Sequence, residues 1–479
     1  MTIETLDEAG VRERAALCRR ASPSFAAWAA GYGVIAHGDL TQLRIHEMAK
    51  RLVERGSVGQ ADDVYRGLAA ADQVASAAMW LVVHMTYARS VRLDGRELDA
   101  ADFKRSPEGH TGGALNMVPA YAGYLAANAL TGVTRSWLMG QGHCVAAIDA
   151  TNVLVGNVTP EHEARYALSD AGFTRLVRDF YSYSLTPDGR PESPLGSHVN
   201  AYTAGGLLEG GYLGFAELLW VHMPLPGERL VAFLSDGAFE EQRGGDWAPR
   251  WWRAEDSGLV SPILIANGRR IDQRTTTAQS GGAAWLRDHL RLNQYDPIDI
   301  DGHDPAAFAW AIFEMEERLS AAAREVFAGE REYPVRLPYA IAESVKGYGF
   351  PGAGTNRAHN LPLSGNPSTD AGAREEFNSG ARRLWVAPDT LREAAQALRR
   401  SAATSRPAER DHALASRRPP DPVLPDLPRH GRGESVSPME SLDEYFCAVV
   451  QSNPGLRPRV GNPDELRSNR MNRTLDRLK

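Results

Sequence analysis

The sequence contains little cysteine, no block of basic residues and no long uncharged apolar run. Its three cysteines, Cys18, Cys144 and Cys447, are far apart in the 479-residue chain. They therefore predict neither a disulfide framework nor a cysteine-based zinc site, and they favour a reducing compartment. The 53 basic and 60 acidic side chains give a net charge of −7. Because no Lys/Arg block is present to follow a phosphate backbone, we expect no nucleic-acid partner.

The chain also lacks the sequence features of a secreted or membrane protein. Its N-terminal segment has no apolar core of the kind that a signal peptide needs. Apolar stretches such as 75–83 are much shorter than the roughly 20 residues of a membrane span. Hydrophobic residues make up 43% and charged residues 24% of the chain, as in globular proteins. We therefore expect a cytoplasmic, globular protein with no membrane partner.

The first 105 residues are expected to form a helical N-terminal extension. Apolar residues recur at helical spacing in 39–55, and 69–88 is rich in alanine. At the other end, 403–438 is rich in proline and arginine and predicts a linker. The segment 439–479 is expected to hold one helix, near 439–451, followed by a polar arm.

The central segment, 106–402, predicts an α/β domain. Short apolar runs at 229–234 and 261–266 have the character of buried strands, and 335–345 is a third candidate. A helix is expected at 305–319, and a short one closes the segment. Strands that alternate with helices favour a doubly wound, mostly parallel sheet covered on both faces.

Two polar residues follow the first two predicted strands. Asp236-Gly237 and Asn267-Gly268 are 31 positions apart, which leaves room for a helix and a return strand. Parallel sheets bind ligands at the carboxyl ends of their strands, and carboxylate and amide oxygens are ligands for Mg²⁺ or Ca²⁺. Asp-Gly and Asn-Gly pairs also make simple turns, so spacing alone leaves both interpretations open.

Four histidines lie in glycine-rich or small-residue surroundings. Neutral imidazoles can donate or accept protons near pH 7, and glycine lets backbone approach a ligand closely. A single histidine of this kind is usually structural, but four together indicate a site. They are His110, His143, His198 and His359.

Two further features are, on their own, weaker indications of a ligand site. The glycines Gly210, Gly211 and Gly214 open an apolar segment that could hold an anionic group on free backbone N–H groups, or could serve helix packing. Lys346 follows the third predicted strand, where it could reach a phosphate or be exposed and inert.

Taken in order, these motifs resemble those of the thiamine diphosphate enzymes of the transketolase superfamily, and among them the phosphoketolases most. The Asp236…Asn267 pair is similar to the GDG…N metal motif of that family, with Ser235 at its first glycine. The other matching segments are 109–110 with GHWG, 140–143 with GPGH, 197–214 with SHV…GxxxEGGELG, 344–347 with PKGW and 359–362 with HQVP. The resemblance extends from about residue 30 to the last residue.

The resemblance implies a role for each matching residue. Mg²⁺ (or Ca²⁺) would be held by the side chains of Asp236 and Asn267 and by the backbone carbonyl of Arg269, against the diphosphate of the cofactor. Residues implied to lie at the thiamine diphosphate are Gly142, Gly210, Gly211, Gly214, Asp236, Gly237 and Asn267. Residues implied to act in catalysis, facing a sugar, are His110, His143, His198, His359 and Lys346.

Some positions depart from the pattern and leave the reaction open. Thr111 replaces the tryptophan of GHWG, and Cys144 follows His143 where the family has glycine. The expected function is to cleave or rearrange a ketose or ketose phosphate through a cofactor-bound carbanion. The alternatives are transketolase-type ketol transfer, epimerisation of a ketose of the xylulose 5-phosphate type, and a non-catalytic scaffold or regulatory subunit.

The last segment resembles a linker between domains. Residues 453–458 and 461–470 are similar to the phosphoketolase stretch LNPD…GPDETASNR at the entry to the second domain. In those enzymes the next domain supplies the glutamate that activates the cofactor. The resemblance therefore predicts half of a split enzyme, a second subunit carrying the pyrimidine-binding and C-terminal domains, and an α₂β₂ assembly.

Overall fold

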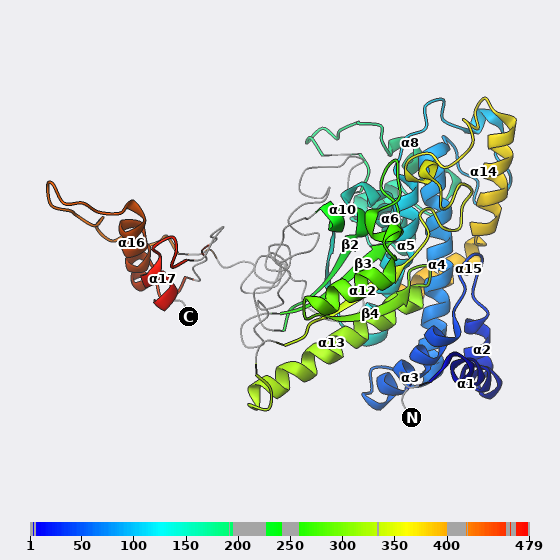
Figure 1. Ribbon diagram of the computed structural model, residues 1–479. Helices are drawn as coiled ribbons and strands as arrows, with labels where there is room; N and C mark the ends of the chain where they lie inside the picture. Colours follow the sequence, from blue (N-terminus) through cyan, green and yellow to red (C-terminus); the bar gives the residue numbers. More distant parts are fainter. Residues whose placement is uncertain are drawn as a thin grey trace. The chain divides into compact units, whose positions relative to one another are not determined.

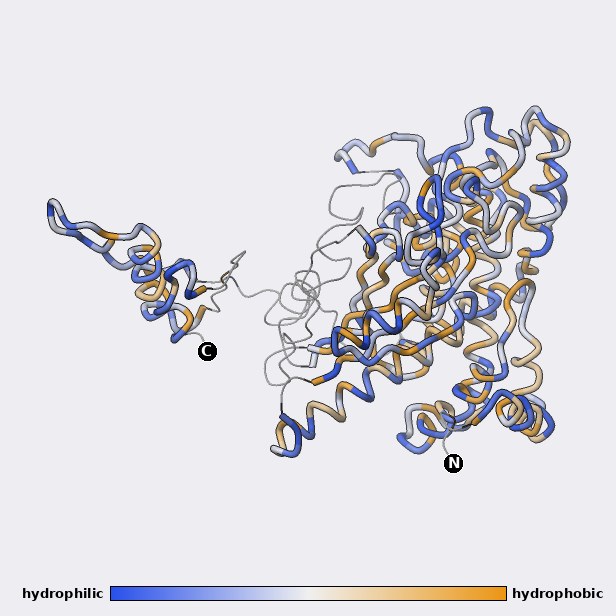
Figure 2. The backbone as a smooth tube through the Cα atoms, in the orientation of Figure 1, coloured by the Kyte–Doolittle hydropathy of each residue, from blue (hydrophilic) through white to orange (hydrophobic). Residues whose placement is uncertain are grey.

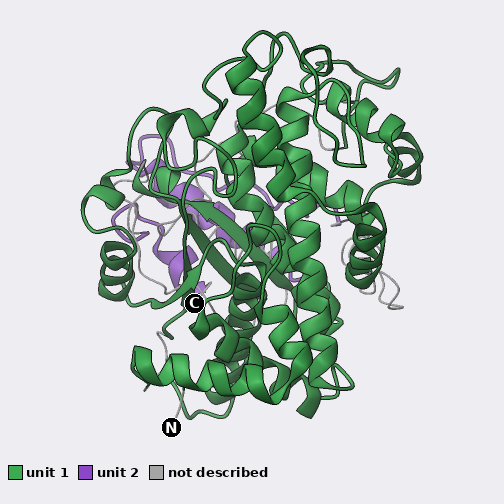
Figure 3. Cartoon of the chain, turned by 90° about the vertical axis from the view of Figure 1, so that its right-hand side faces the viewer, with its two compact units in different colours: residues 1–404 green, residues 405–479 purple. Residues whose placement is uncertain are grey.

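The structure is a computed structural model that describes residues 3, 6–190, 192–194, 227–241, 258–332, 335–399, 418, 420–456, 460 and 466–477. They belong to two compact units, 1–404 and 405–479, each of which is described by itself (Figure 3). The first unit is an α/β body built around one parallel sheet (Figure 1).

Four helices form the N-terminal part of the first unit, as the sequence predicts. Asp7 caps the first helix by accepting from the backbone N–H of Gly10, and Ser22 caps the second in the same way at Phe25. The helices are α1 (Glu8–Ala21), α2 (Pro23–Ala29), α3 (Asp39–Glu54) and α4 (Ala61–Tyr87). Helix α4 is long and apolar enough to cross a membrane, but 89% of its most apolar window is buried inside the unit, as in a core helix.

Within the described residues the sheet has five strands, and every pair of neighbours is parallel. Its order is β1-β2-β3-β5-β4, with bounds β1 (Ser136–Met139), β2 (Arg229–Ser235), β3 (Leu259–Ala266), β4 (Asp296–Asp301) and β5 (Pro338–Glu343). This confirms the parallel α/β class and the three predicted strands, although β5 is shorter than expected. The sequence did not predict β1 and β4, which form the two edges of the sheet.

Hydrophobic side chains cover both faces of the sheet, as a doubly wound fold requires. Along β2, Val231 and Phe233 enter one core, while Leu230 and Leu234 enter the other. Helices α5 (Thr111–Thr131) and α13 (Pro305–Phe327) supply the first core, and α10 (Asp236–Glu241) and α12 (Ala283–Leu292) supply the second. Figure 2 shows hydrophobic positions concentrated along the central strands.

The described part of the first unit contains further helices and 3₁₀ turns. They are η2 (Ala100–Asp102), η3 (Gly142–Cys144), α6 (Val145–Val155), α7 (Pro160–Arg165), α8 (Asp170–Asp179), α11 (Thr276–Gln279), η5 (Asn356–His359), α14 (Ala371–Leu384) and α15 (Pro388–Arg399). One hydrophobic cluster contains residues from Phe25 to Leu398. The N-terminal helices therefore share a core with the sheet, and a domain boundary at residue 105 stays a prediction.

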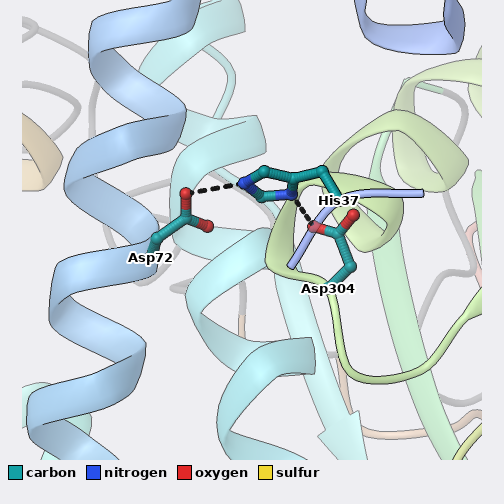
Figure 4. Close-up of side chains that lie close together, drawn as sticks. All are labelled: His37, Asp72 and Asp304. Carbon is teal, nitrogen blue, oxygen red and sulfur yellow. Dashed lines mark hydrogen bonds and ion pairs between the residues drawn. The ribbon is translucent and has the colours of Figure 1, made fainter. Parts of the chain in front are cut away.

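A buried charged cluster joins the N-terminal helices to the sheet region. His37, which precedes α3, lies between Asp72 of α4 and Asp304, the N-cap of α13 (Figure 4). Its Nδ1 is 2.9 Å from Asp304 Oδ1 and its Nε2 is 3.0 Å from Asp72 Oδ2. Because both ring nitrogens face carboxylate oxygens at hydrogen-bond distance, the cluster has the geometry of an imidazolium held by two acids.

The described part of the second unit contains two helices, α16 (Pro438–Ser452) and α17 (Asn472–Arg477). Buried Asp443 of α16 joins them by accepting from the backbone N–H groups of Arg473 and Thr474, each at 2.8 Å. Helix α16 confirms the helix predicted near 439–451. Residues 420–437 contain no helix or strand, and the linker at 403–438 stays a prediction.

Candidate active site

A cavity of about 450 Å³ opens at the carboxyl ends of β1, β2, β3 and β5, which are neighbours in the sheet. This is the edge where parallel sheets bind ligands. Eight of the residues predicted from the sequence line it, namely His110, His143, Asp236, Gly237, Asn267, Arg269, Lys346 and His359. Gly142 is buried in η3 next to His143. His198, Gly210, Gly211 and Gly214 lie outside the described residues.

One edge of the cavity carries oxygen ligands. Asp236 follows β2, is only 2% exposed, and accepts from the backbone N–H of Gly268 at 2.7 Å. Gly268 has φ +76°, a conformation that a side chain would strain. Asn267 Oδ1 accepts from the N–H of Arg269 at 3.1 Å. Because the Asp236 carboxylate accepts from Gly268, it lies beside the turn that contains the Asn267 amide and the Arg269 carbonyl.

This donor set fits a hard divalent cation. A carboxylate, an amide oxygen and a backbone carbonyl are ligands that Mg²⁺ and Ca²⁺ prefer. Burial raises the pKa of Asp236 to about 7, and a bound cation would favour the charged form. The residues present therefore suit the predicted metal, while their assignment as ligands stays a prediction.

Lys346 is buried in the cavity wall, 3% exposed, rather than free at the surface. Its Nζ donates to the carbonyl oxygens of Arg269 and Arg270 at 3.2 and 2.9 Å, and lies 2.8 Å from Nδ1 of His359. Burial lowers its pKa to about 8, so the ammonium stays mostly charged at neutral pH. Because an ammonium only donates, Nδ1 of His359 accepts and the ring carries its proton on Nε2.

Three of the predicted histidines meet in the cavity. The ring centroids of His110 and His143 are 5.2 Å apart, and both rings lie 5.5 Å from His359. Burial lowers the pKa of all three, that of His143 to about 4 and that of His359 to about 3, and the charge of Lys346 acts in the same direction. At physiological pH the cluster is therefore neutral and offers N–H donors and lone pairs.

Close packing at the start of α5 brings these histidines together. The N–H and hydroxyl of Thr111 donate to the carbonyl of Asn360, at 3.3 and 2.7 Å. A Cβ on Gly112 would lie 2.1 Å from the carbonyl oxygen of Ala358, and a Cβ on Gly113 would lie 2.6 Å from the sulfur of Cys144. The glycines near His110 are therefore required for packing η3 and η5 against α5.

Sequence reasoning missed three polar residues of the site. Asn116 holds the turn after β5 by donating to the carbonyl of Val345 and accepting from the N–H of Gly347. Gln141 borders the cavity, and its buried Oε1 has no hydrogen-bond partner among the described residues. The hydroxyl oxygen of Tyr181 lies 2.9 Å from Nδ1 of His110. Gln141 stands inside a predicted motif, whereas Asn116 and Tyr181 are brought in by tertiary packing and have no local signal.

The two sides of the cavity differ in the chemical groups that they present. One edge can hold a cation and, through it, an anionic group. The other presents neutral imidazoles, a buried ammonium and an amide, which suit a substrate with several hydroxyl or carbonyl groups.

Two family models match the chain. The model described as "XFP N-terminal domain" matches residues 65–418, and the one described as "D-xylulose 5-phosphate/D-fructose 6-phosphate phosphoketolase" matches residues 440–479.

Similar curated proteins carry the same family name. A "Probable phosphoketolase" of Bifidobacterium animalis subsp. lactis is 26% identical over 438 residues, 83% of this chain and 50% of that protein. Another, of Rhodopseudomonas palustris strain BisB5, is 28% identical over 341 residues, 67% of this chain and 39% of that protein. The chain thus spans half or less of the length of these two relatives.

Similar chains among solved structures include transketolases. One from Pichia stipitis, titled as a complex with sedoheptulose 7-phosphate, is 16% identical with a TM-score of 0.42, covering 84% of this chain and 57% of that chain. One from Leishmania mexicana is 15% identical with a TM-score of 0.39, covering 85% and 57%.

Proposed function

The chain belongs to the XFP N-terminal domain family of the phosphoketolases, and on that premise we propose that it is the thiamine diphosphate-binding part of a phosphoketolase-like enzyme acting on a ketose or ketose phosphate. The observation that carries the proposal is the single cavity that unites Asp236 and Asn267 with three neutral histidines and Lys346. A scaffold protein would not need these residues together, and this counts against the non-catalytic alternative.

The oxygen ligands fit the cofactor's metal. Asp236, Asn267 and the carbonyl of Arg269 would hold Mg²⁺ or Ca²⁺, and the cation would hold the diphosphate. When bound, thiamine diphosphate supplies a nucleophilic carbanion for a ketose carbonyl.

The imidazoles would act on the substrate's oxygen atoms. Attack on a carbonyl places negative charge on its oxygen, which N–H donors in a water-poor cavity stabilise. The proton that Lys346 fixes on Nε2 of His359 makes that ring such a donor. His110 and His143, which are also neutral, would contribute donors or receive protons from substrate hydroxyls.

A two-component assembly is part of the proposal. A second chain with the pyrimidine-binding and C-terminal domains would complete the site in an α₂β₂ complex. Its support is the likeness of residues 453–470 to a phosphoketolase linker. We also propose a cytoplasmic location, which the three widely spaced cysteines favour.

The first test measures thiamine diphosphate binding to the chain by calorimetry, with and without Mg²⁺. We expect Mg²⁺-dependent binding that weakens on the order of 100-fold in Asp236→Asn. Asp288→Asn, whose carboxylate is 79% exposed on α12, is the matched control and should bind as the unaltered chain does. Equal affinity in Asp236→Asn and the unaltered chain would contradict the metal assignment.

A second test separates the possible reactions. The chain, copurified with the product of its neighbouring reading frame, is incubated with xylulose 5-phosphate, thiamine diphosphate, Mg²⁺ and phosphate in D₂O and followed by NMR. Acetyl phosphate with a shortened aldose phosphate would support a phosphoketolase. An exchanged or inverted ketose, or transfer only to an added aldose, would support the epimerase or transketolase alternatives, for which the bulkier Cys144 beside His143 is the favouring observation.

A further inference from the structure

Tyr181 contacts the histidine cluster from outside the cavity. Its hydroxyl lies 2.9 Å from Nδ1 of His110. The residue is half-buried and does not line the cavity, whereas His110 does. The phenol therefore reaches the substrate side only through the imidazole.

The hydrogen bond has a preferred direction. Among the described residues the Tyr181 hydroxyl has no acceptor other than Nδ1 of His110. Burial raises the pKa of Tyr181 to about 12, so the phenol keeps its proton and can donate. If Nδ1 carried the imidazole proton instead, that proton would point at the phenol oxygen and the phenolic proton would have no acceptor within the described part of the chain.

The backbone at this point is held in an unfavourable conformation. Tyr181 has φ +56°, in the left-handed region that bulky residues avoid. Phe180, immediately before it, is 2% exposed and anchored in the core. The strained turn directs Phe180 into the core and the next side chain to His110, and strain of this kind persists where the surroundings enforce it.

We propose that Tyr181 is a positioning residue that fixes the proton of His110 on Nε2, the ring nitrogen left for the cavity. Lys346 imposes the same tautomer on His359. Two imidazoles, each held at Nδ1 by a donor from the protein, thus present N–H groups to the cavity. The consequence for turnover rests on the proposed function, whereas the tautomer of His110 does not.

The tautomer is measured on the full chain, labelled with ¹⁵N-histidine, by long-range ¹H–¹⁵N correlation at pH 7.5 without cofactor or substrate. His110→Gln identifies the His110 signals. We expect a protonated Nε2 and an unprotonated Nδ1, and in Tyr181→Phe a shift of both nitrogens toward the averaged values of mixed tautomers. An Nδ1-protonated ring, or identical His110 signals in Tyr181→Phe, would overturn the proposal.

Tyr183→Phe is the matched control. Tyr183 has the same φ of +56°, is 62% exposed, and donates to Glu108 at 2.6 Å instead of to His110. Its removal should leave the His110 signals in place. The His359 signals, held by Lys346, should stay unchanged in both variants and show that the cavity is intact.

Turnover of the assembled enzyme tests whether positioning of His110 by Tyr181 matters for catalysis. We expect Tyr181→Phe to lower kcat about tenfold with little change in KM, since its loss disorders a donor needed mainly in the transition state. A tautomer shift with unchanged kcat would overturn the role in turnover. Absence of any ketose reaction in the unaltered enzyme would contradict the proposed function and leave the tautomer result standing.

Discussion

His37 and Asp304, 267 positions apart in the chain, form a hydrogen bond of 2.9 Å with both side chains fully buried. Asp72 Oδ2 lies at hydrogen-bond distance from the other ring nitrogen, Nε2. Burial by itself lowers the pKa of His37, but the hydrogen bonds and charges of Asp304 and Asp72 outweigh it and raise the pKa to about 10. The imidazole of His37 is therefore protonated between the two carboxyl groups.

The raised pKa predicts how His37 titrates. Because its folded-state pKa exceeds the ordinary 6.5, the stability that His37 contributes is fully present below pH 6.5 and is lost as the pH rises through 10. In an NMR titration of the histidines, the signals that His37→Gln removes should stay at their protonated positions from pH 6 to about 8.5. A midpoint near 6.5 for those signals would contradict the charged cluster.

A buried ion pair predicts a large loss of stability. Arg135 binds Glu316 through two hydrogen bonds of 2.6 and 2.8 Å, and neither side chain exceeds 4% exposure. Glu316→Ala leaves the guanidinium unpaired in the core and should lower the free energy of unfolding by about 3–5 kcal/mol. Glu47→Ala, which removes a surface partner of Lys50, should change it by less than about 1 kcal/mol. Urea unfolding measures the free energy of unfolding of both variants. Similar losses in the two would contradict a stabilising role for the buried pair of Arg135 and Glu316.

The close approach of α5 and η5 predicts intolerance of a methyl group. In Gly112→Ala the new Cβ would meet the backbone carbonyl of Ala358 at 2.1 Å, so a backbone segment has to move. We expect a loss of about 1–3 kcal/mol in the free energy of unfolding. Gly59→Ala, where the nearest atom is a flexible carboxylate oxygen at 3.5 Å, should be neutral. An equally stable Gly112→Ala variant would show that η5 packs differently.

The unpartnered amide of Gln141 predicts a stabilising substitution. Its buried Oε1 has no partner among the described residues, and its Nε2 reaches only the sulfur of Met117 at 3.8 Å. Gln141→Met keeps the size and removes the polar group, so the chain without ligand should gain about 1 kcal/mol. Asn116→Leu, which removes an amide bonded to Val345 and Gly347, should lose stability instead. Thermal unfolding of both variants provides the comparison, and a destabilised Gln141→Met would contradict the missing partner.

Local sequence patterns predicted some of the elements that carry the site. Apolar runs located β2 and β3, and the polar residues after them, Asp236 and Asn267, do lie at one edge of a cavity. Strand β4 escaped prediction because it lies at the edge of the sheet, where aspartates alternate with apolar residues. Helix α5 did too, because it is buried on nearly all sides and shows little amphipathic periodicity.

The tertiary part of the site lay beyond sequence reasoning. The motif around His359 indicated a histidine at the site, but not that Lys346 would be buried against its ring. Tyr181 has no neighbouring motif, and its contact with His110 depends on how the turn after α8 packs. Residues that act on a ligand leave a pattern in the sequence, whereas those that orient them can come from any nearby turn.

The hydrogen bonds between Thr111 and Asn360 have a consequence for biosynthesis. The two residues are 249 positions apart, and at about 5–20 residues per second the ribosome needs roughly 12 to 50 s to make the intervening chain. Until Asn360 has been made, Thr111 at the start of the apolar helix α5 has no hydrogen-bond partner there. Long-range contacts of this kind slow folding, so the nascent chain spends that interval with the apolar helix α5 only partly covered, when chaperone binding or aggregation competes with completion of the site.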